Sequence, residues 1–214
     1  MIASATDAVL QATDFRPRPA HAQDLPSLVD TLVAAFRDDP VMTWLIPDPV
    51  HRPRILRAIF EITADVAHPF GGLYTTDPLP AAGAVWIPPG CQPTGEEAEQ
   101  LAAWYIEAAE DNAERAATVL QLMDERHPEA LHDYLFFIGT RPEWQSRGLG
   151  SALLADVLGR CDLEARPAYL EATSGGSRDL YLRHGFEVTG EIVLPDGPSM
   201  WCMWREPAVG SGTR

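Results

Sequence analysis

The sequence has few basic side chains for its acidic content. Lys and Arg together number 16 against 31 Asp and Glu, which leaves a formal net charge of −15 and an isoelectric point near 4.6. Nucleic acids and anionic membrane surfaces bind proteins through basic patches, so this balance argues against both as partners. It is compatible with a cationic substrate, and equally with acidity that serves only solubility.

Cysteine is scarce, and long apolar runs are missing. Cys91, Cys161 and Cys202 lie far apart, in a pattern that fits neither a disulfide framework nor a metal site, so we expect reduced, buried thiols and no bound metal. No apolar run reaches the roughly 18–20 residues that span a bilayer. Residues 1–14 lack the basic start and apolar core of a signal peptide. These absences predict a soluble, cytoplasmic protein.

The chain is long enough for a sizeable core, and no linker divides it. With 214 residues and 46% hydrophobic content, we expect one domain over residues 15–207, with flexible tails at 1–14 and 208–214. Proline limits residues 15–20 to a short edge strand. Periodicity and turn residues predict helices at 25–36 and 51–67, an interruption at 38–47, a hairpin at 72–76 and 83–87, two helices within 94–126, and strands at 168–172, 186–194 and 200–205.

The most informative stretch runs from Leu135 to Leu158. It begins with the aromatic and β-branched content of a buried strand, passes through the turn Gln145-x-x-Gly148-x-Gly150, and continues at helical spacing. A strand, a glycine-bearing turn and a helix together direct free backbone N–H groups and the positive end of a helix dipole at an anion. A β-carbon at either glycine would keep phosphate oxygens off the backbone, and the turn favours residues that tolerate positive φ. The pattern predicts a pyrophosphate site.

Strand alternation predicts the faces of the central strand. It puts Tyr134, Phe136, Ile138 and Thr140 on one face, and Asp133, Leu135 and Phe137 on the other.

Three motifs in order resemble the GCN5-related N-acetyltransferase (GNAT) superfamily. The loop at 145–150 is similar to its acyl-CoA loop, and Tyr181-x-x-x-Gly185-Phe186 to its Tyr-x-x-x-Gly-Phe element. The tail at 194–203 is similar to the closing strand of the puromycin N-acetyltransferase branch. The resemblance extends from about Phe15 to about Pro207. It implies an α+β fold, an α/β/α sandwich whose mixed, mostly antiparallel sheet of six or seven strands carries helices on both faces.

The resemblance also implies acetyl-CoA as cosubstrate. The strand before the loop would bind the pantetheine arm and the loop the pyrophosphate, with Arg147 beside it either pairing with phosphate or solvated. Where relatives often carry an asparagine before the tyrosine-bearing helix, this chain has Ser177, which reaches less far. The cofactor-binding residues expected on this basis are Ile138, Gly139, Thr140, Gln145, Ser146, Arg147, Gly148, Leu149, Gly150, Ser151 and Ser177.

Catalysis then needs an acid for the departing thiolate and a base for the ammonium acceptor. By resemblance Tyr181 is the acid, since a phenol stays protonated at neutral pH; otherwise it is a tyrosine packed on the sheet. Glu171 is expected to act as the base through water, or else to be a hydrogen-bonded strand carboxylate. His132 and Asp133 are alternatives for the base. No Gly-x-Ser-x-Gly elbow or activated cysteine is present, so direct transfer is expected.

The acceptor is the least defined part of this prediction. The region between the first two helices shapes the acceptor pocket in the superfamily, which makes Phe36 and Trp44 candidates; Tyr105 would line a lid, or all three belong to the core. Asp133 replaces an aromatic residue of the puromycin branch. The leading expectation is an acetyl-CoA-dependent N-acetyltransferase for a small-molecule amine, such as an antibiotic or aminonucleoside.

Three other interpretations stay open. The acceptor is instead a polypeptide amine or a polyamine, or the chain is a regulatory module that binds acyl-CoA without transferring anything. A dinucleotide-binding fold is weaker, because its third glycine is missing after Gly148-Leu149-Gly150. A homodimer is also considered.

Overall fold

A computed structural model describes residues 15–208, so most of the two predicted tails lies outside the described residues. The strands are β1 (Arg16–Pro19), β2 (Leu73–Asp77), β3 (Ala82–Ile87), β4 (Asp133–Thr140), β5 (Ala168–Ala172), β6 (Glu187–Val193) and β7 (Ser199–Arg205). The α-helices are α1 (Leu25–Phe36), α2 (Pro40–Leu45), α3 (Arg52–Ala67), α4 (Glu96–Ala108), α5 (Ala113–Asp124), α6 (Leu149–Leu163) and α7 (Gly175–Arg183). Only α2 was not predicted.

The seven strands form one sheet in the order β1-β2-β3-β4-β5-β7-β6. Every neighbouring pair is antiparallel except β4 and β5, which are parallel. The predicted sheet, with a short edge strand at β1, is therefore confirmed. The parallel pair requires a crossover, and α6 supplies it.

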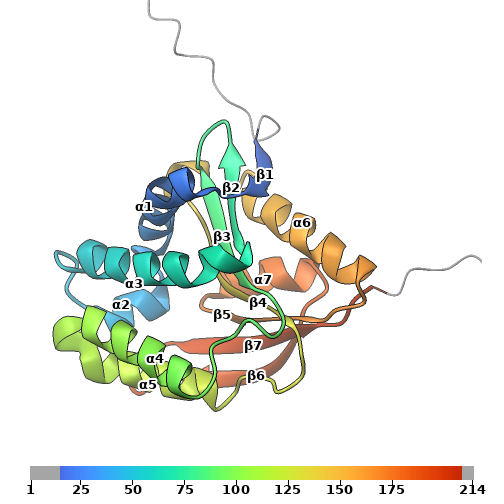
Figure 1. Cartoon of the computed structure of the whole chain (residues 1–214). Coiled ribbons are helices and arrows are strands. Elements are labelled where there is room, and N and C mark those ends of the chain that lie inside the picture. The colour runs from blue at the N-terminus through green and yellow to red at the C-terminus, as the bar shows by residue number, and fades with distance from the viewer. Residues whose placement is uncertain (1–14, 209–214) are drawn as a thin grey trace, which may run out of the picture.

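Helices cover both faces of the sheet and create two cores (Figure 1). On one face α1, α3, α4 and α5 enclose a cluster that includes Leu56 and Phe60. On the other face α6 and α7 enclose a second cluster that includes Leu153 and Leu154. Figure 1 shows α1 and α3 to the left of the sheet and α6 and α7 to the right. The sandwich is the predicted one.

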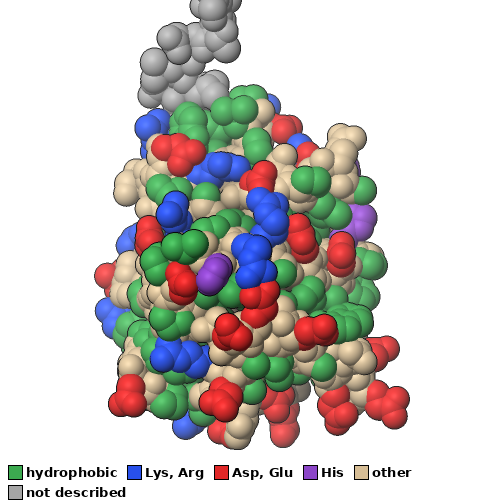
Figure 2. All heavy atoms as spheres, turned by 90° about the vertical axis from the view of Figure 1, so that its left-hand side faces the viewer, with side chains coloured by type: hydrophobic (Ala, Val, Ile, Leu, Met, Phe, Trp, Pro, Cys, Tyr) green, Lys and Arg blue, Asp and Glu red, His purple; other side chains and the backbone are tan. Residues whose placement is uncertain are grey.

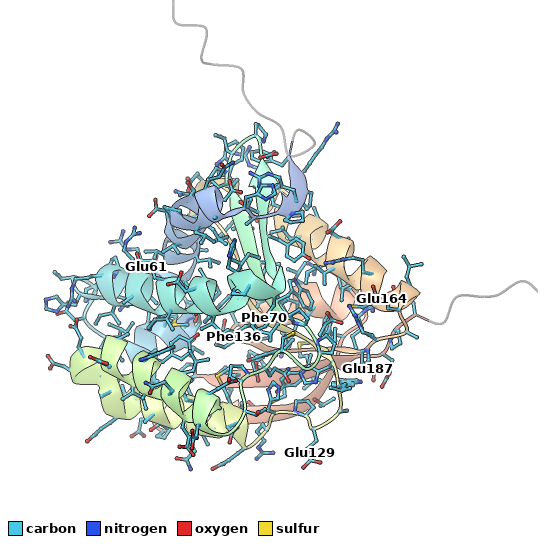
Figure 3. The ribbon with its side chains drawn as sticks, in the orientation of Figure 1. Glu61, Phe70, Glu129, Phe136, Glu164 and Glu187 are labelled. Atoms are coloured by element: carbon cyan, nitrogen blue, oxygen red, sulfur yellow. The ribbon has the colours of Figure 1, made fainter. Side chains whose placement is uncertain are left out.

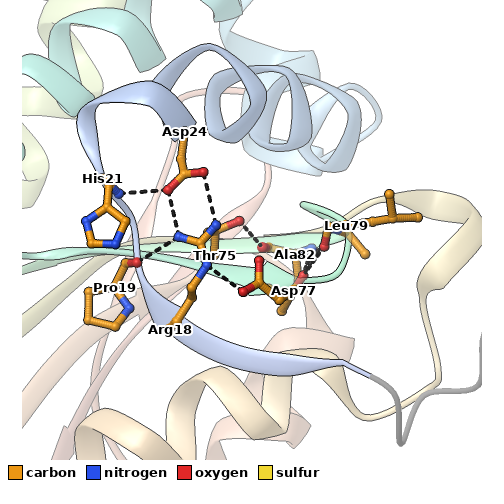
Figure 4. A network of polar contacts seen from close by, with 10 residues as sticks. Arg18, Pro19, His21, Asp24, Thr75, Asp77, Leu79 and Ala82 are labelled. Atoms are coloured by element: carbon orange, nitrogen blue, oxygen red, sulfur yellow. Dashed lines mark hydrogen bonds and ion pairs between the residues drawn. The ribbon is translucent and has the colours of Figure 1, made fainter.

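An arginine fixes the edge strand β1 to strand β2 and to the start of helix α1 (Figure 4). Arg18 donates to the two carboxylate oxygens of Asp24 at 2.6 and 3.0 Å, and its Nε lies 2.9 Å from Asp77 in β2. The guanidinium lowers the pKa of Asp24 to about 2. The contacts join the strand to the start of α1, because a strand of four residues holds its place poorly by its ladder alone.

A β-bulge in β4 overturns the alternation expected for this strand. Val85 pairs with Phe137 and Trp86 with Leu135, so Phe136 is one residue too many. Phe136 and Phe137 both pack against the cluster of Leu56 and Phe60, called here the α1–α3 core. Ile138 packs against the cluster of Leu153 and Leu154, called here the α6 core. The predicted faces are therefore wrong from Phe137 onward. Figure 3 shows Phe136 inside the molecule, between α3 and the α4–α5 pair, and Glu61, Glu129, Glu164 and Glu187 at its periphery.

Beyond the bulge, β4 and β5 separate. They pair only at Asp133–Ala168, Tyr134–Tyr169 and Leu135–Leu170, although β4 continues to Thr140. Residues 137–140 keep their pairing with β3, and residues 136–140 have no strand partner on the β5 side among residues 15–208. An opening in the middle of the sheet exposes main-chain groups of a kind that usually pair.

Three further properties concern the cysteines, the surface charge and the length of the helices. All three cysteines are free thiols; Cys161 and Cys202 are buried, but Cys91 is only half-buried. Acidic side chains gather along the lower edge of the face in Figure 2, where α4 and α5 lie, and arginines run across its middle. Neither sign of charge covers this face completely. Among residues 15–208, no helix is both long enough and apolar enough to cross a membrane.

Candidate active site

A cavity of about 880 Å³ lies where β4 and β5 separate. Two groups of elements form its walls. Helices α1, α2, α4 and α5 form one side, and the loop before α6 together with α7 forms the other. It gathers most of the residues predicted from the sequence, namely Phe36, Tyr105, Ile138, Gly139, Thr140, Gln145, Ser146, Gly148, Leu149, Gly150, Ser151, Glu171, Ser177 and Tyr181.

Two predicted residues lie outside this lining. The Arg147 guanidinium stacks 4.7 Å over the ring of Trp144. Trp44 lines a separate small cavity at the molecular surface, where its Nε1 donates to the Pro195 carbonyl at 3.0 Å and Arg115 stacks on its indole. The structure does not bring these two side chains to the others.

The loop at 145–150 has two residues with positive φ just before the N-terminus of α6. Gly148 adopts φ +83° and caps α6, and a β-carbon built there meets nothing within 4 Å. Ser146 also has positive φ, at +59°, which is uncommon for a residue with a side chain. Backbone N–H groups of such alternating turns converge on a concavity in front of the helix N-terminus.

Of the two reasons expected for glycine, positive φ is found at Gly148 but not at Gly150, and the approach of phosphate stays a prediction. Gly150 lies inside α6 without positive φ, and a β-carbon there would touch only Leu180, at 3.5 Å, and Thr140, at 4.0 Å. Gly139 has a different reason: a β-carbon would lie 2.6 Å from that of Ala35, so α1 packs directly on β4. Gly139 thus serves helix packing as well as lining the cavity.

Hydroxyl groups at the start of α7 are engaged with one another. Ser174 is the N-cap of α7, and its hydroxyl accepts from the Ser177 N–H at 3.1 Å while the Ser177 hydroxyl oxygen accepts from the Ser174 N–H at 3.2 Å. Through this reciprocal cap Ser177 stabilises the start of α7. Ser151 pairs with His184 at 3.0 Å.

Tyr181 projects from α7 into the core on the α6 side and is 6% exposed. Its ring packs against Phe186 at 5.9 Å between centroids. Burial, with a smaller contribution from the negative Asp39, raises the pKa of the phenol well above its ordinary value. The hydroxyl has no hydrogen-bond partner among residues 15–208, so a protonated phenol borders the cavity with its proton uncommitted.

Glu171 lies on the opposite face of the sheet. It follows the last β4–β5 pair and alternates with Leu170 and Ala172, which face the α6 core. The Tyr134 hydroxyl donates to Oε2 at 2.8 Å, whereas Oε1 is buried without a partner among the described residues. Burial raises the pKa of this carboxyl to about 7, against the opposing effects of the Tyr134 and Tyr169 hydroxyls.

The two alternative bases do not reach the cavity. The His132 imidazole is 1% exposed, lies among the rings of Tyr134, Tyr169 and Trp204, and bonds to the Ala130 carbonyl. Asp133 pairs with Arg166 at 2.9 Å. Their positions leave Glu171 as the predicted base that borders the cavity.

Asp39 is a cavity residue that the sequence analysis missed. One carboxylate oxygen accepts from the N–H groups of Val41 and Met42 at 2.9 and 3.1 Å, which caps α2. The other accepts from the Thr173 hydroxyl, across the opening. Burial raises the pKa of Asp39. The local signal was available, because an aspartate before Pro40 is a common way to start a helix.

Known proteins share both the sequence pattern and this architecture. A family model for the acetyltransferase (GNAT) domain matches residues 96–206, slightly more than half of the chain. The chain belongs to the GNAT acetyltransferase family. A solved structure named as histone acetyltransferase HPA2 and related acetyltransferase, from Corynebacterium glutamicum, is 30% identical with a TM-score of 0.69, over 92% of this chain and 99% of that one.

Two more distant relatives are also N-acetyltransferases by name. An uncharacterised N-acetyltransferase of Schizosaccharomyces pombe is 25% identical over 185 residues, covering 81% of this chain and 74% of the yeast protein. Arylalkylamine N-acetyltransferase 2 from Aedes aegypti is 13% identical with a TM-score of 0.62, over 90% of this chain and 99% of that one, and so shares the fold. The protein is therefore an N-acetyltransferase, and GNAT enzymes use acetyl-CoA. The comparisons do not single out the puromycin branch.

Proposed function

We propose that this GNAT enzyme transfers an acetyl group from acetyl-CoA directly to the amine of a small molecule, with Glu171 as base and Tyr181 as acid. The observation that carries the proposal is the placement of these two side chains on opposite faces of the sheet, beside one cavity. Direct transfer needs a base beside the attacking amine and an acid beside the departing sulfur, and this arrangement offers one of each at the same cavity.

The donor side of the cavity suits acetyl-CoA. The segment of β4 at 138–140, which is open on its β5 side, would bind the amide groups of the pantetheine arm. The loop at 145–150 would bind the pyrophosphate. The open space over Gly148 supports this fit, since any larger residue would fill it. Bound there, acetyl-CoA would supply an acetyl group activated as a thioester. Within residues 15–208, no group of His, Cys, Asp and Glu side chains is placed to hold a metal ion.

Glu171 is suited to accept a proton at neutral pH. A carboxyl with a pKa of about 7 is a far better base than an ordinary one, and the ideal catalytic pKa lies near the working pH. Its unpartnered Oε1 leaves one strong acceptor free for an ammonium group or for a water that relays the proton. Tyr181 complements it, because its raised pKa keeps the proton until a thiolate forms.

A thiol-release assay with acetyl-CoA tests the proposal against puromycin, simple alkyl and aryl amines, aminoglycosides, polyamines and lysine peptides. We expect turnover with a small-molecule amine. Tyr181→Phe should lower kcat by about 10²–10⁴-fold, the usual contribution of a general acid, and leave acetyl-CoA affinity unchanged. Leu182→Ala is a matched control, because Leu182 is exposed on the same helix.

Two results would count against the proposal. Tyr181→Phe with full activity would remove its role as acid, and preference for the peptides would replace the acceptor by a polypeptide. The peptide arm is easy to interpret, because all 16 basic residues of this chain are arginines and any acetyl-lysine must come from the peptide. A homodimer stays a prediction.

A further inference from the structure

The part of the cavity bordered by α4, α5 and Glu171, which we call the acceptor half, has a composition that restricts which amines it can hold. We infer that the acceptor is a monoamine with an apolar body, its amine at Glu171 and its body against α4 and α5. The inference rests on the proposed function and narrows its substrate class.

Only one buried anion in the cavity is free to receive an ammonium group. Three acidic residues line it: Asp38, Asp39 and Glu171. The carboxylate of Asp39 is occupied by two backbone N–H groups and by Thr173. Asp38 is exposed, and an ion pair in water adds little affinity. Half-buried Glu171 is the one of the three with a buried oxygen, Oε1, that has no partner among the described residues, so it fixes where the reacting amine binds.

The wall of the cavity that α4 and α5 form is apolar. Tyr105 from α4 and Val119 from α5 are 7% and 8% exposed, and half-buried Met123 extends the same wall. The one hydroxyl that these three side chains contribute, that of Tyr105, pairs with Thr63 at 2.9 Å and carries no charge that could balance a cation. Phe136 continues the surface, with its ring 6.3 Å from that of Tyr105.

This composition discriminates by charge. A diamine or guanidine-bearing amine bound at Glu171 would place its second cation on the apolar wall, stripped of water and without a counter-ion. An alkyl or aryl body there instead gains by leaving water. Met42, Met123 and Met200 all border the cavity, and methionine adapts to different shapes, so bodies of varied outline should be accepted.

Matched amines test this directly. Steady-state kinetics at saturating acetyl-CoA would compare pentylamine and 2-phenylethylamine with 1,5-diaminopentane, which differs from pentylamine by one terminal amine. We expect both monoamines to exceed the diamine in kcat/KM by about 100-fold or more, the scale on which sites reject a group they cannot satisfy. Calorimetric titration of each amine into the protein with CoA should give the same order of affinity.

A charge placed on the wall should reverse the preference. Met123→Glu adds an anion at a half-buried position, and Met123→Gln is its uncharged control of similar size. We expect the diamine-to-monoamine ratio of kcat/KM to rise about tenfold or more in the Glu variant relative to the Gln variant. Leu120→Glu and Leu120→Gln repeat the comparison at a neighbouring half-buried position of α5, in case the first pair folds poorly.

The outcomes separate the two levels of the proposal. A wild-type enzyme that prefers the diamine, or a ratio that is the same in the Glu and Gln variants at both positions, overturns the monoamine inference and leaves small-molecule acetylation standing. Binding of acetyl-CoA without turnover of any amine in the broad panel overturns both. Monoamine preference with a shift only in the Glu variants supports the inference.

Discussion

Glu171 shows how burial alone changes what a side chain can do. The same carboxyl in water would have a pKa of 4.5 and accept protons poorly, whereas the end of the β4–β5 pairing removes it from solvent and raises that pKa to about 7. The Tyr134 hydroxyl holds one oxygen at 2.8 Å and leaves the other free. The group gains basicity because its ionised form is unfavourable in the folded protein.

This unfavourable ionisation predicts that Glu171→Gln stabilises the protein above neutral pH. Since the folded pKa lies above the ordinary 4.5, folding loses stability as the pH rises from 4.5 through 7, in total by roughly 3 kcal/mol at about 1.4 kcal/mol per pKa unit. We expect the variant to unfold at a higher Tm than wild type at pH 8, with a much smaller difference at pH 4.5.

The same substitution should abolish the rise of kcat/KM with an apparent pKa near 7. A base must be deprotonated to act, so the wild-type rate should increase through that range, and the glutamine variant should be slower and flat there. Equal Tm gains at both pH values, or an unchanged pH profile, would contradict the assignment of Glu171.

At the scale of elements, the bulge at Phe136 and the α6 N-terminus together create the donor side. The bulge ends the regular alternation of β4 just before the strand parts from β5. The chain then turns through Ser146 and Gly148, both with positive φ, and enters α6, whose first residues line the cavity. One strand therefore supplies both an unpaired edge and the approach to a helix dipole.

We predict that Gly148→Ala lowers both stability and cofactor affinity. A β-carbon at φ +83° costs about 1–2 kcal/mol, and it fills the open space in front of α6. Gly159→Ala is the matched control, because Gly159 lies within α6 with free space around it and without positive φ. That control should gain about 0.5–1 kcal/mol of unfolding free energy and keep the affinity for acetyl-CoA. Urea unfolding and calorimetric titration would check both; equal behaviour of the two variants would remove the special role of Gly148.

At the scale of the whole molecule, the cavity lies where the β1–β4 half of the sheet parts from the β5–β7 half. Within the sheet, only three residue pairs between β4 and β5 join these halves. The Thr173 hydroxyl, just beyond β5, adds a bond to Asp39 at the α1–α2 corner. This bond ties the helices of the acceptor side to the β5–α7 half.

Thr173→Val should therefore weaken the whole fold. The change keeps the shape of the side chain and leaves a buried carboxylate oxygen without its donor, at a cost of about 1–3 kcal/mol. The loss should be larger at pH 8 than at pH 4, because the remaining burial raises the pKa of Asp39 further and penalises only the ionised form. Thr118→Val removes an exposed hydroxyl bond to the Glu114 carbonyl within α5 and should change stability by no more than about 0.5 kcal/mol. Similar losses in both variants would show that the crossing bond contributes nothing.

Local sequence determined the elements and the donor loop of this protein. The strand at 168–172 matches its prediction residue for residue, and Gly185, at φ +84°, follows the last turn of α7 as a C-terminal glycine does. Proline, glycine and apolar spacing act within a few residues, so a single sequence reveals their effects. The order of three such motifs was enough to indicate the GNAT family.

Tertiary structure decided the rest. Alternation failed at Phe136 because a bulge depends on how β4 pairs with β3, which no local pattern records. The separation of β4 from β5, the burial that raises the pKa of Glu171, and the bond from Thr173 to Asp39 all join segments distant in the chain. The residue types predicted an acid, a base and an anion-binding loop. Only packing decided which carboxylate lies beside the cavity with an unpartnered oxygen.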